Sequence, residues 1–206
     1  MIRVLLADDQ EMIRTALATT LDLEDDLEVV GQAGTCAEAV AVAARARPDV
    51  ALLDVQMPTG GLAGEDGLDA IAPLLAAAPG VRVLVVTTFG RPGYLRRALE
   101  AGALGFMVKD APIERLLEGI RRVSQGLRHV DPELAAASLS LGASPLTERE
   151  AQVLAASIGG AATAEIAAAV FLSEGTVRNY LSAAIGKLGA RNRAEAIRTA
   201  LDNGWI

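Results

Sequence analysis

The sequence predicts an α/β fold, a parallel sheet with helices on both faces, followed by a smaller all-α domain. Over residues 1–125, short apolar runs alternate with helical stretches in five successive strand–helix units, the order typical of a parallel sheet. From residue 146 to 206 the pattern is helical and carries no strand signal. Residues 126–145 separate the two parts, and we expect them to form a linker with one short helix.

Composition excludes several classes of protein. The 206 residues, 51% of them apolar, suffice for two small domains with cores of their own. No apolar run approaches the ~20 residues that a bilayer requires, and the N-terminus lacks the pattern of a signal peptide, so no membrane association is expected. A single cysteine, Cys36, fits a reducing cytoplasm. His129 is the only histidine, which disfavours multi-histidine metal sites and Ser/His/Asp catalysis.

Each predicted strand is a short apolar run bounded by turn residues. The clearest is Val50–Leu53, which lies between Pro48 and Pro58 and is expected to be buried on both faces. The other predicted strands are Ile2–Ala7, Leu27–Ala33, Val81–Thr87 and Gly105–Lys109. The predicted helices are Met12–Leu23, an alanine-rich helix that opens with a capping box at Thr35–Glu38, Asp66–Ala78, Tyr94–Ala101 and Ile113–Gln125.

Carboxylates follow two of these strands. Asp54 comes directly after Val50–Leu53, and Asp8 and Asp9 come directly after the N-terminal strand. Open α/β sheets place their chemistry at the carboxyl ends of strands. If the two strands are neighbours, the three carboxylates cannot all stay ionised unless a cation joins them. Hard oxygen ligands of this kind favour Mg²⁺.

The C-terminal part predicts a helix-turn-helix. A capping box at Thr147–Glu150 opens the first helix, Thr163 is a candidate cap for the second, and Ser173 for the third, after a tight turn. A fourth helix is expected at about Ala194–Asn203. The third helix carries Val177 and Leu181 on its apolar face.

The polar face of the third helix carries Arg178, Asn179 and Ser182. Arginine suits guanine and asparagine suits adenine in the major groove. The segment from Arg178 to Arg198 is also basic, which is modest evidence for a polyanionic partner. An ordinary solvated helix face is the alternative.

Taken together, these residues resemble the two-domain bacterial response regulators with a LuxR-type output domain, the NarL/FixJ subfamily. The motif residues of the first domain are Asp8, Asp9, Asp54, Thr87 and Lys109. Those of the output domain are Leu146–Glu150, Glu165–Ala167 and Thr176–Arg178. The resemblance implies a CheY- or flavodoxin-like receiver with strand order 2-1-3-4-5 over residues 1–125, and a LuxR-type DNA-binding domain over residues 146–206.

The resemblance also implies the roles of the acidic residues. Asp54 would accept a phosphoryl group from a sensor histidine kinase, and the protein would have no other enzymatic activity. Mg²⁺ would be held by Asp9, Asp54 and the backbone carbonyl of Gln56, with Asp8 contributing through water. The metal would offset the charge of the carboxylates and of the transferring group.

Three further residues would read the phosphorylation state. Lys109 would pair with the phosphoryl oxygens, and Thr87 would donate a hydrogen bond to them. Phe106 would rotate inward as Thr87 moves. The added charge would then bias a two-state rearrangement that frees the output domain and favours a homodimer.

On double-stranded promoter DNA, the residues expected at base edges are Arg178, Asn179 and Ser182. Those expected at phosphates are Thr176, Lys187 and Arg191. The family dimerises its output domains through the last helix, so Ile197, Ala200 and Leu201 are candidates for that contact. Packing inside their own domain is the alternative for these three residues.

A finer resemblance and two departures qualify the family pattern. Thr87–Tyr94 and Arg178–Tyr180 resemble regulators of membrane-lipid desaturase genes that answer to a thermosensing kinase. The loop Thr59–Glu65 is longer than usual and rich in flexible glycine. It borders Asp54, so it bears on metal geometry and kinase docking, although a tolerated surface insertion is the favoured reading. The second departure is Thr163, at a position where the resembled family commonly has asparagine.

Three other functions would fit parts of the sequence pattern. The receiver could bind partners without being phosphorylated, but its intact set of acidic, hydroxyl and lysine residues argues against this. A phosphoaspartate-type hydrolase would need a second aspartate two residues beyond its nucleophile, and Asp8-Asp9-Gln10 lacks that spacing. A nucleotide-binding domain would need a glycine-rich phosphate motif after a strand, and none is present.

Overall fold

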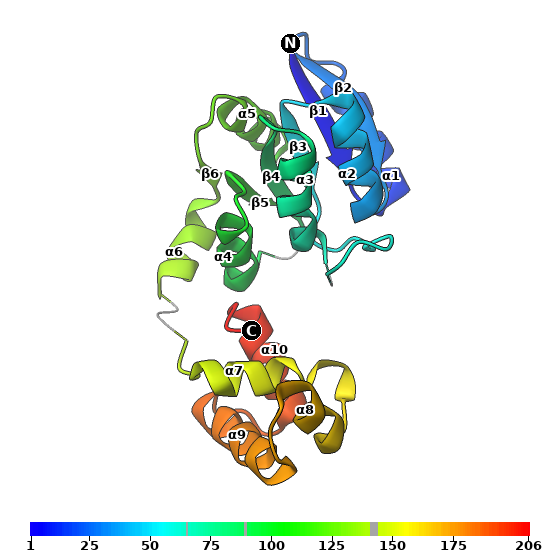
Figure 1. The fold of residues 1–206 in the computed structure, drawn as a ribbon. Coiled ribbons are helices and arrows are strands. Elements are labelled where there is room, and N and C mark those ends of the chain that lie inside the picture. Colours follow the sequence, from blue (N-terminus) through cyan, green and yellow to red (C-terminus); the bar gives the residue numbers. More distant parts are fainter. Residues whose placement is uncertain (65, 89, 141–143) are drawn as a thin grey trace. The chain divides into compact units, whose positions relative to one another are not determined.

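The computed structural model describes residues 1–64, 66–88, 90–140 and 144–206 (Figure 1). The chain divides into two compact units, one built mainly from the residues up to Ala135 and the other from Ala136–Ile206. Three sequence features extend beyond the described residues: residue 65 of the long loop, residue 89 of the stretch Thr87–Tyr94, and residues 141–143 of the expected hinge.

The N-terminal unit contains a six-stranded parallel sheet in the order β2-β1-β3-β4-β5-β6. The strands are β1 (Ile2–Ala7), β2 (Leu27–Ala33), β3 (Val50–Leu53), β4 (Arg82–Thr87), β5 (Gly105–Val108) and β6 (His129–Val130). The five expected strands and their order are confirmed. The sixth corrects the five-strand prediction and lies within the predicted linker. The sequence did not reveal it, because two residues are too few to show an alternating pattern. They form a strand only by pairing with the free edge of β5.

Helices cover both faces of this sheet. They are α1 (Glu11–Leu21), α2 (Cys36–Ala46), the 3₁₀ turn η1 (Gly67–Ala70), α3 (Ile71–Ala77), α4 (Pro92–Glu100) and α5 (Ile113–Ser124). A further helix, α6 (Pro132–Ser140), is divided between the two units, and its Leu134 belongs to the core of the N-terminal one. One face packs against α2, α3 and α4, and the other against α1 and α5 (Figure 1). The prediction that helices cover both faces of the sheet is therefore confirmed.

The strand before Asp54 explains why this sheet has two cores. Ala51 and Leu53 point into the cluster under α2, α3 and α4, while Val50 and Leu52 point into the cluster under α1 and α5. All four are 3% exposed or less. A continuous apolar run is what a central parallel strand requires, because no face of it meets water.

The glycine-rich loop is attached to α2. Thr35 caps this helix, since its side chain accepts a hydrogen bond from the backbone N–H of Glu38. The first two helical N–H groups, of Cys36 and Ala37, donate to the carbonyl oxygens of Pro58 and Thr59 at 2.9 and 3.1 Å. The chain at the start of the loop thus satisfies helix-end donors that would otherwise lack partners.

The C-terminal unit is a helical bundle of α7 (Glu148–Ala155), η2 (Ile158–Gly160), α8 (Thr163–Val170), α9 (Glu174–Lys187) and α10 (Arg193–Asp202). Its core includes Val153, Leu154, Ile166, Val177 and Leu181, which come from α7, α8 and α9. In the part of the chain that the structure describes, no helix combines the length and apolarity needed to cross a membrane.

Among the predicted helix caps, Thr147 and Ser173 are confirmed. The box predicted at Thr35–Glu38 forms only in half, because the Glu38 carboxylate accepts the N–H of Gly34 at 2.9 Å instead of that of Thr35. Thr147 and Glu150 form a capping box, and the Ser173 side chain accepts the N–H of Thr176. The prediction for Thr163 is wrong, because α8 begins at Thr163 itself and Ala162 occupies the cap position. There the Glu165 carboxylate accepts the backbone N–H of Ala162 at 2.7 Å, which is the half of a capping box that requires no hydroxyl at the cap position.

Gly67 is required by a close approach of two backbone segments. Its N–H donates to the carbonyl oxygen of Val55 at 2.7 Å. A Cβ at this position would lie 1.9 Å from the carbonyl oxygen of Asp54. Any side chain there must push η1 away from the end of β3.

We therefore expect Gly67→Ala to destabilise the N-terminal unit by roughly 1–3 kcal/mol, the usual cost of overpacking a filled interior. Denaturant unfolding followed by circular dichroism measures this. Gly34→Ala is the matched control, because a Cβ there would meet Arg14 and Glu38 side-chain atoms at ordinary distances of 3.5 and 3.7 Å. Equal stability of the two variants would contradict the steric argument.

Candidate functional site

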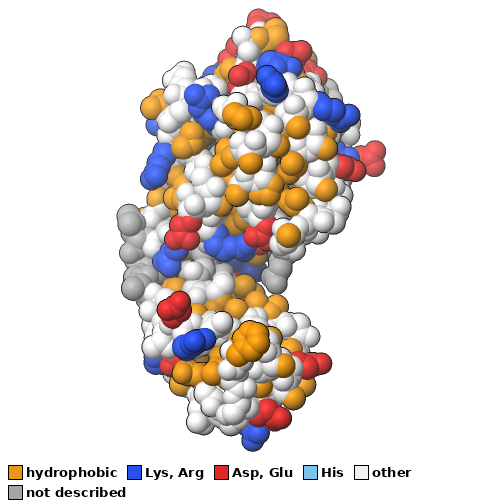
Figure 2. Space-filling model, in the orientation of Figure 1, with side chains coloured by type: hydrophobic (Ala, Val, Ile, Leu, Met, Phe, Trp, Pro, Cys, Tyr) orange, Lys and Arg blue, Asp and Glu red, His pale blue; other side chains and the backbone are white. Residues whose placement is uncertain are grey.

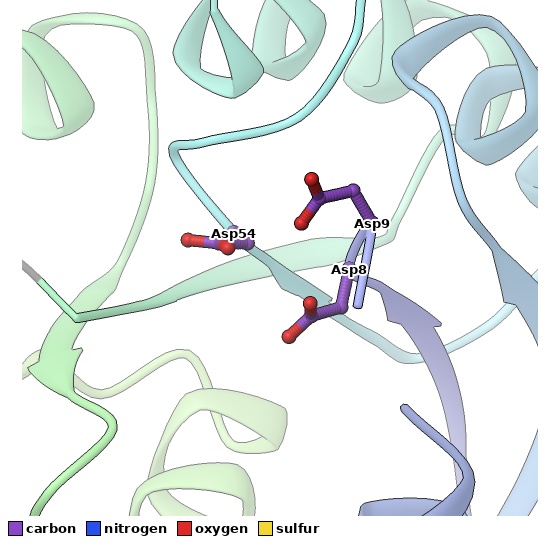
Figure 3. A group of neighbouring side chains, drawn as sticks. All are labelled: Asp8, Asp9 and Asp54. Atoms are coloured by element: carbon purple, nitrogen blue, oxygen red, sulfur yellow. The ribbon is translucent and has the colours of Figure 1, made fainter. Parts of the chain in front are cut away.

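Three carboxylates meet at the carboxyl edge of the sheet (Figure 3). Asp8 and Asp9 follow β1, Asp54 follows β3, and these strands are hydrogen-bonded neighbours with Ala7 opposite Leu53. One oxygen from each side chain lies within 4.8 Å of the others. Asp8 and Asp54 are buried, whereas Asp9 is exposed. The predicted acidic cluster is therefore present.

Lys109, directly after β5, supplies a cation to this cluster. Its Nζ lies 2.6 Å from Asp8 Oδ2 and 2.9 Å from Asp54 Oδ2. Burial alone would lower the pKa of Lys109, but the hydrogen bonds to Asp8 and Asp54 outweigh it and raise that pKa. The lysine therefore stays charged and offsets part of the negative charge.

The carboxylate oxygens differ in what they contact. Asp8 Oδ1 accepts the backbone N–H of Gln10 at 3.0 Å, so both oxygens of Asp8 are engaged. Asp54 Oδ1 is buried and has no hydrogen-bond partner among the described residues. A buried acceptor without a partner is costly unless a cation or donor completes it. Asp54 and the exposed Asp9 therefore fit a hard divalent cation, with Asp8 better suited to an indirect contact.

The remaining predicted residues of this site lie on β4, β5 and the loop after β3. Thr87 ends β4 and is fully buried, and its carbonyl oxygen accepts the N–H of Lys109 at 2.8 Å. Phe106 in β5 is also fully buried, so its ring already lies in the core. Gln56 follows β3 with an exposed side chain.

One group of charged residues beside this edge escaped the sequence analysis. Arg97 of α4 lies 2.7 Å from Asp66, the cap residue of η1, and 3.5 Å from Asp69 within η1. Burial would lower the pKa of Arg97, but the bond to Asp66 outweighs it and raises that pKa. The partners are far apart in sequence, so no local pattern pointed to them. They connect α4 to the segment that Gly67 holds against the end of β3.

In the C-terminal unit, α9 exposes the residues predicted to read bases. Arg178, Asn179 and Ser182 are exposed, while Val177 and Leu181 of the same helix are buried. Arg178 forms an exposed ion pair with Glu174 at 3.3 Å. Such pairs contribute little, so this contact leaves the guanidinium able to bind elsewhere.

The residues predicted to contact phosphates have different surroundings. Thr176 is partly buried, and its hydroxyl lies 2.8 Å from that of Ser173. The Arg191 side chain is 85% exposed and pairs with Glu195. Lys187 Nζ lies 2.7 Å from Oε2 of Glu150, a buried carboxylate on α7.

Two of the three dimer candidates on α10 reach the surface. Ile197 and Leu201 are partly exposed. Ala200 is fully buried in the core of its own unit and offers no surface to a second copy. The helical period predicted that all three lie on one side of α10, but it could not predict which of them are buried within their own unit.

Surface charge alone does not locate a DNA-binding surface. In Figure 2, basic and acidic side chains are interspersed over the visible face. The net charge of the chain is −7, which gives no general attraction for nucleic acid. The case for DNA binding therefore rests on α9 and on likeness to known proteins.

Comparison with protein families matches both units. Residues 4–121 match the response regulator receiver domain, and residues 144–200 match the bacterial regulatory proteins of the luxR family. The chain is 42% identical over 206 residues to the transcriptional regulatory protein DesR of Bacillus subtilis, covering all of both chains.

Solved structures give the same result. The response regulator ChrA of a haem-sensing two-component system is 34% identical, with a TM-score of 0.57, over 100% of this chain and 98% of ChrA. A structure of two RcsB dimers bound to DNA has a TM-score of 0.71 over 98% of each chain, and at 20% identity the likeness concerns the fold. The chain thus belongs to the two-component response regulators that join a receiver to a LuxR-type DNA-binding domain, a family of phosphorylation-dependent transcription regulators and not of enzymes.

Proposed function

We propose that Asp54 accepts a phosphoryl group from a sensor histidine kinase and that this modification promotes dimerisation and promoter binding. The observation that carries the proposal is the state of Asp54. Its side chain is buried, Lys109 contacts one carboxylate oxygen, and the other has no partner among the described residues. That combination is suited to a reactive carboxylate and unsuited to a purely structural one.

The transfer is a simple substitution at phosphorus. An Asp54 oxygen forms the new O–P bond, the P–N bond to the kinase histidine breaks, and that imidazole leaves and regains its proton from solvent. Lys109 lies beside the oxygens that gain charge and pairs with them. Mg²⁺ held by Asp9, Asp54 and the Gln56 carbonyl would offset phosphoryl charge. Positioning and charge therefore account for most of the chemistry.

The new group carries roughly one or more additional negative charges. Because Lys109 bridges Asp8 and Asp54 before the reaction, a phosphoryl group draws its ammonium away from Asp8. The Thr87 hydroxyl then turns toward the phosphoryl oxygens, and the buried Phe106 fills the space that it leaves. These shifts move β4, α4 and β5 and favour the dimer.

In the dimer, each α9 would enter a major groove of promoter DNA. Arg178, Asn179 and Ser182 would contact base edges, because they share the exposed face of this helix. Thr176 and Arg191 would contact phosphates. Ile197 and Leu201 would lie at the contact between output domains. As a regulator that binds promoter DNA, the protein would act in the cytoplasm.

Phosphorylation is tested by intact mass after incubation with Mg²⁺ and acetyl phosphate. We expect a phosphoryl adduct and a shift toward dimer in the wild type, and neither in Asp54→Asn, which has no nucleophilic oxygen of the same kind. Asp110→Asn, an exposed change next to Lys109, is the control and should be labelled normally. An adduct on Asp54→Asn, or none on the wild type, would overturn the assignment.

Metal binding is tested by replacing Lys109 with methionine. At an effective dielectric of about 20, a unit charge about 4 Å away is worth ~4 kcal/mol. Removing the ammonium that competes for Asp8 and Asp54 should therefore tighten Mg²⁺ binding at least about tenfold. Titration calorimetry measures this, and Asp9→Asn should weaken binding. Unchanged affinity in Lys109→Met would show that the metal lies elsewhere.

Base recognition is tested with Arg178→Ala on a duplex that the wild-type chain selects from a random pool. Loss of a bidentate arginine–guanine contact should cost about 1–3 kcal/mol and relax preference at one guanine. Arg198→Ala removes the same charge from the exposed surface of α10 and should leave base preference unchanged. If both variants lose affinity equally and keep their preference, Arg178 acts only through its charge.

A further inference from the structure

The C-terminal end of α9 is attached to α7 by one ion pair. Lys187, the last residue of α9, has its Nζ 2.7 Å from Oε2 of Glu150. We propose that Lys187 is a positioning residue that fixes the recognition helix against α7 through Glu150, and that it is not a phosphate ligand. This inference rests on the proposed DNA-binding role of α9 and revises the sequence-based expectation for Lys187.

Hydrogen bonds with Thr147, independent of Lys187, hold Glu150 in position. Its side chain is 7% exposed. The same Oε2 accepts the backbone N–H of Thr147 at 2.7 Å, and the Thr147 hydroxyl accepts the N–H of Glu150 at 3.3 Å. The capping box that starts α7 therefore also fixes the carboxylate that receives Lys187.

The charge of Glu150 depends on this contact. The hydrogen bond from Lys187, together with the Thr147 N–H, lowers the pKa of Glu150. Removing one partner of a buried ion pair leaves a desolvated charge uncompensated, which is strongly destabilising. If the Lys187 ammonium moved to a DNA phosphate, the Glu150 carboxylate would lose its ion-pair partner. The Lys187 side chain is 40% exposed, but its ammonium is paired with Glu150.

The rest of the α7–α9 contact is apolar. Val177, Leu181 and Ala184 pack into the core, and such packing is not directional. The ion pair is the directional contact at the C-terminal end of α9. It sets the tilt of the helix, and thereby the positions of Arg178, Asn179 and Ser182 on its exposed face.

The test compares Lys187→Met, Glu150→Gln and the double variant in the full chain, on a duplex that the wild type selects from a random pool. Lys187→Met should weaken binding at least about fivefold at every salt concentration, because misplaced side chains lose their base contacts. The slope of log affinity against log salt should stay as in the wild type, since no phosphate contact is lost. Arg191→Met, which removes an equal charge from an exposed position, gives the comparison slope.

The remaining variants separate the two roles. In the double variant no buried charge is left unpaired to displace α9 further, so binding should recover part of what Lys187→Met loses, although the pair that orients the helix is absent. Glu150→Gln alone should not bind more tightly than the wild type. If Lys187 contacts a phosphate, Lys187→Met lowers the salt slope by about one, Glu150→Gln frees the lysine and tightens binding, and the double variant recovers nothing. Any of these results would overturn the proposal.

If the wild type selects no duplex, the proposed function is refuted but the role of the ion pair is not. A stability measurement then tests the ion pair by itself. Trp205 is the only tryptophan and packs against the output-domain core, so its fluorescence reports unfolding of that unit. Lys187→Met should lower the midpoint by about 5 °C or more, and the double variant should recover part of this. Additive effects of the two substitutions would refute the role of Lys187 in holding α9.

Discussion

The receiver depends on a balance of charge at the carboxyl edge of its sheet. Parallel pairing of β1 with β3 forces Asp8 and Asp54 together, both buried, and Lys109 from the end of β5 lies within 3 Å of each. Without that ammonium the site would hold adjacent carboxylates in a poorly solvated place. The balance is incomplete, because one oxygen of Asp54 keeps no partner among the described residues. That oxygen is the one that the proposed cation or phosphoryl group would engage.

The segment after β3 is built tightly around this edge. Gly67 lets the backbone of η1 approach the carbonyl of Asp54, and Asp66 and Asp69 bind Arg97 of α4. Asp54 is therefore connected to α4 through a short series of direct contacts, along which the proposed phosphorylation would act. The glycine-rich insertion is tied to the N-terminus of α2, where its carbonyls satisfy free helix donors.

The same pair of residue types has different consequences in the two units. Each unit has a buried carboxylate that a lysine from another element neutralises, Asp54 with Lys109 and Glu150 with Lys187. Glu150 also accepts the N–H of Thr147, while Asp54 Oδ1 accepts nothing among the described residues. A satisfied carboxylate holds helices in place, whereas an unsatisfied one can react. Hydrogen-bond completion, more than burial or charge, distinguishes the structural site from the functional one.

The sequence by itself determined the α/β class, the strand order through its family resemblance, the acidic cluster with Lys109, and the polar face of α9. The class, the acidic residues at strand ends and the polar helix face follow from local patterns, since apolar runs, caps and helical periods act over a few residues. The strand order and the place of Lys109 in the cluster came from the resemblance. Tertiary structure alone decided the two-residue strand β6, the pairing of Arg97 with Asp66, the burial of Ala200 and the engagement of Lys187 with Glu150. Each depends on groups far apart in the chain, and a side chain reveals its partner only once folding has brought the two together.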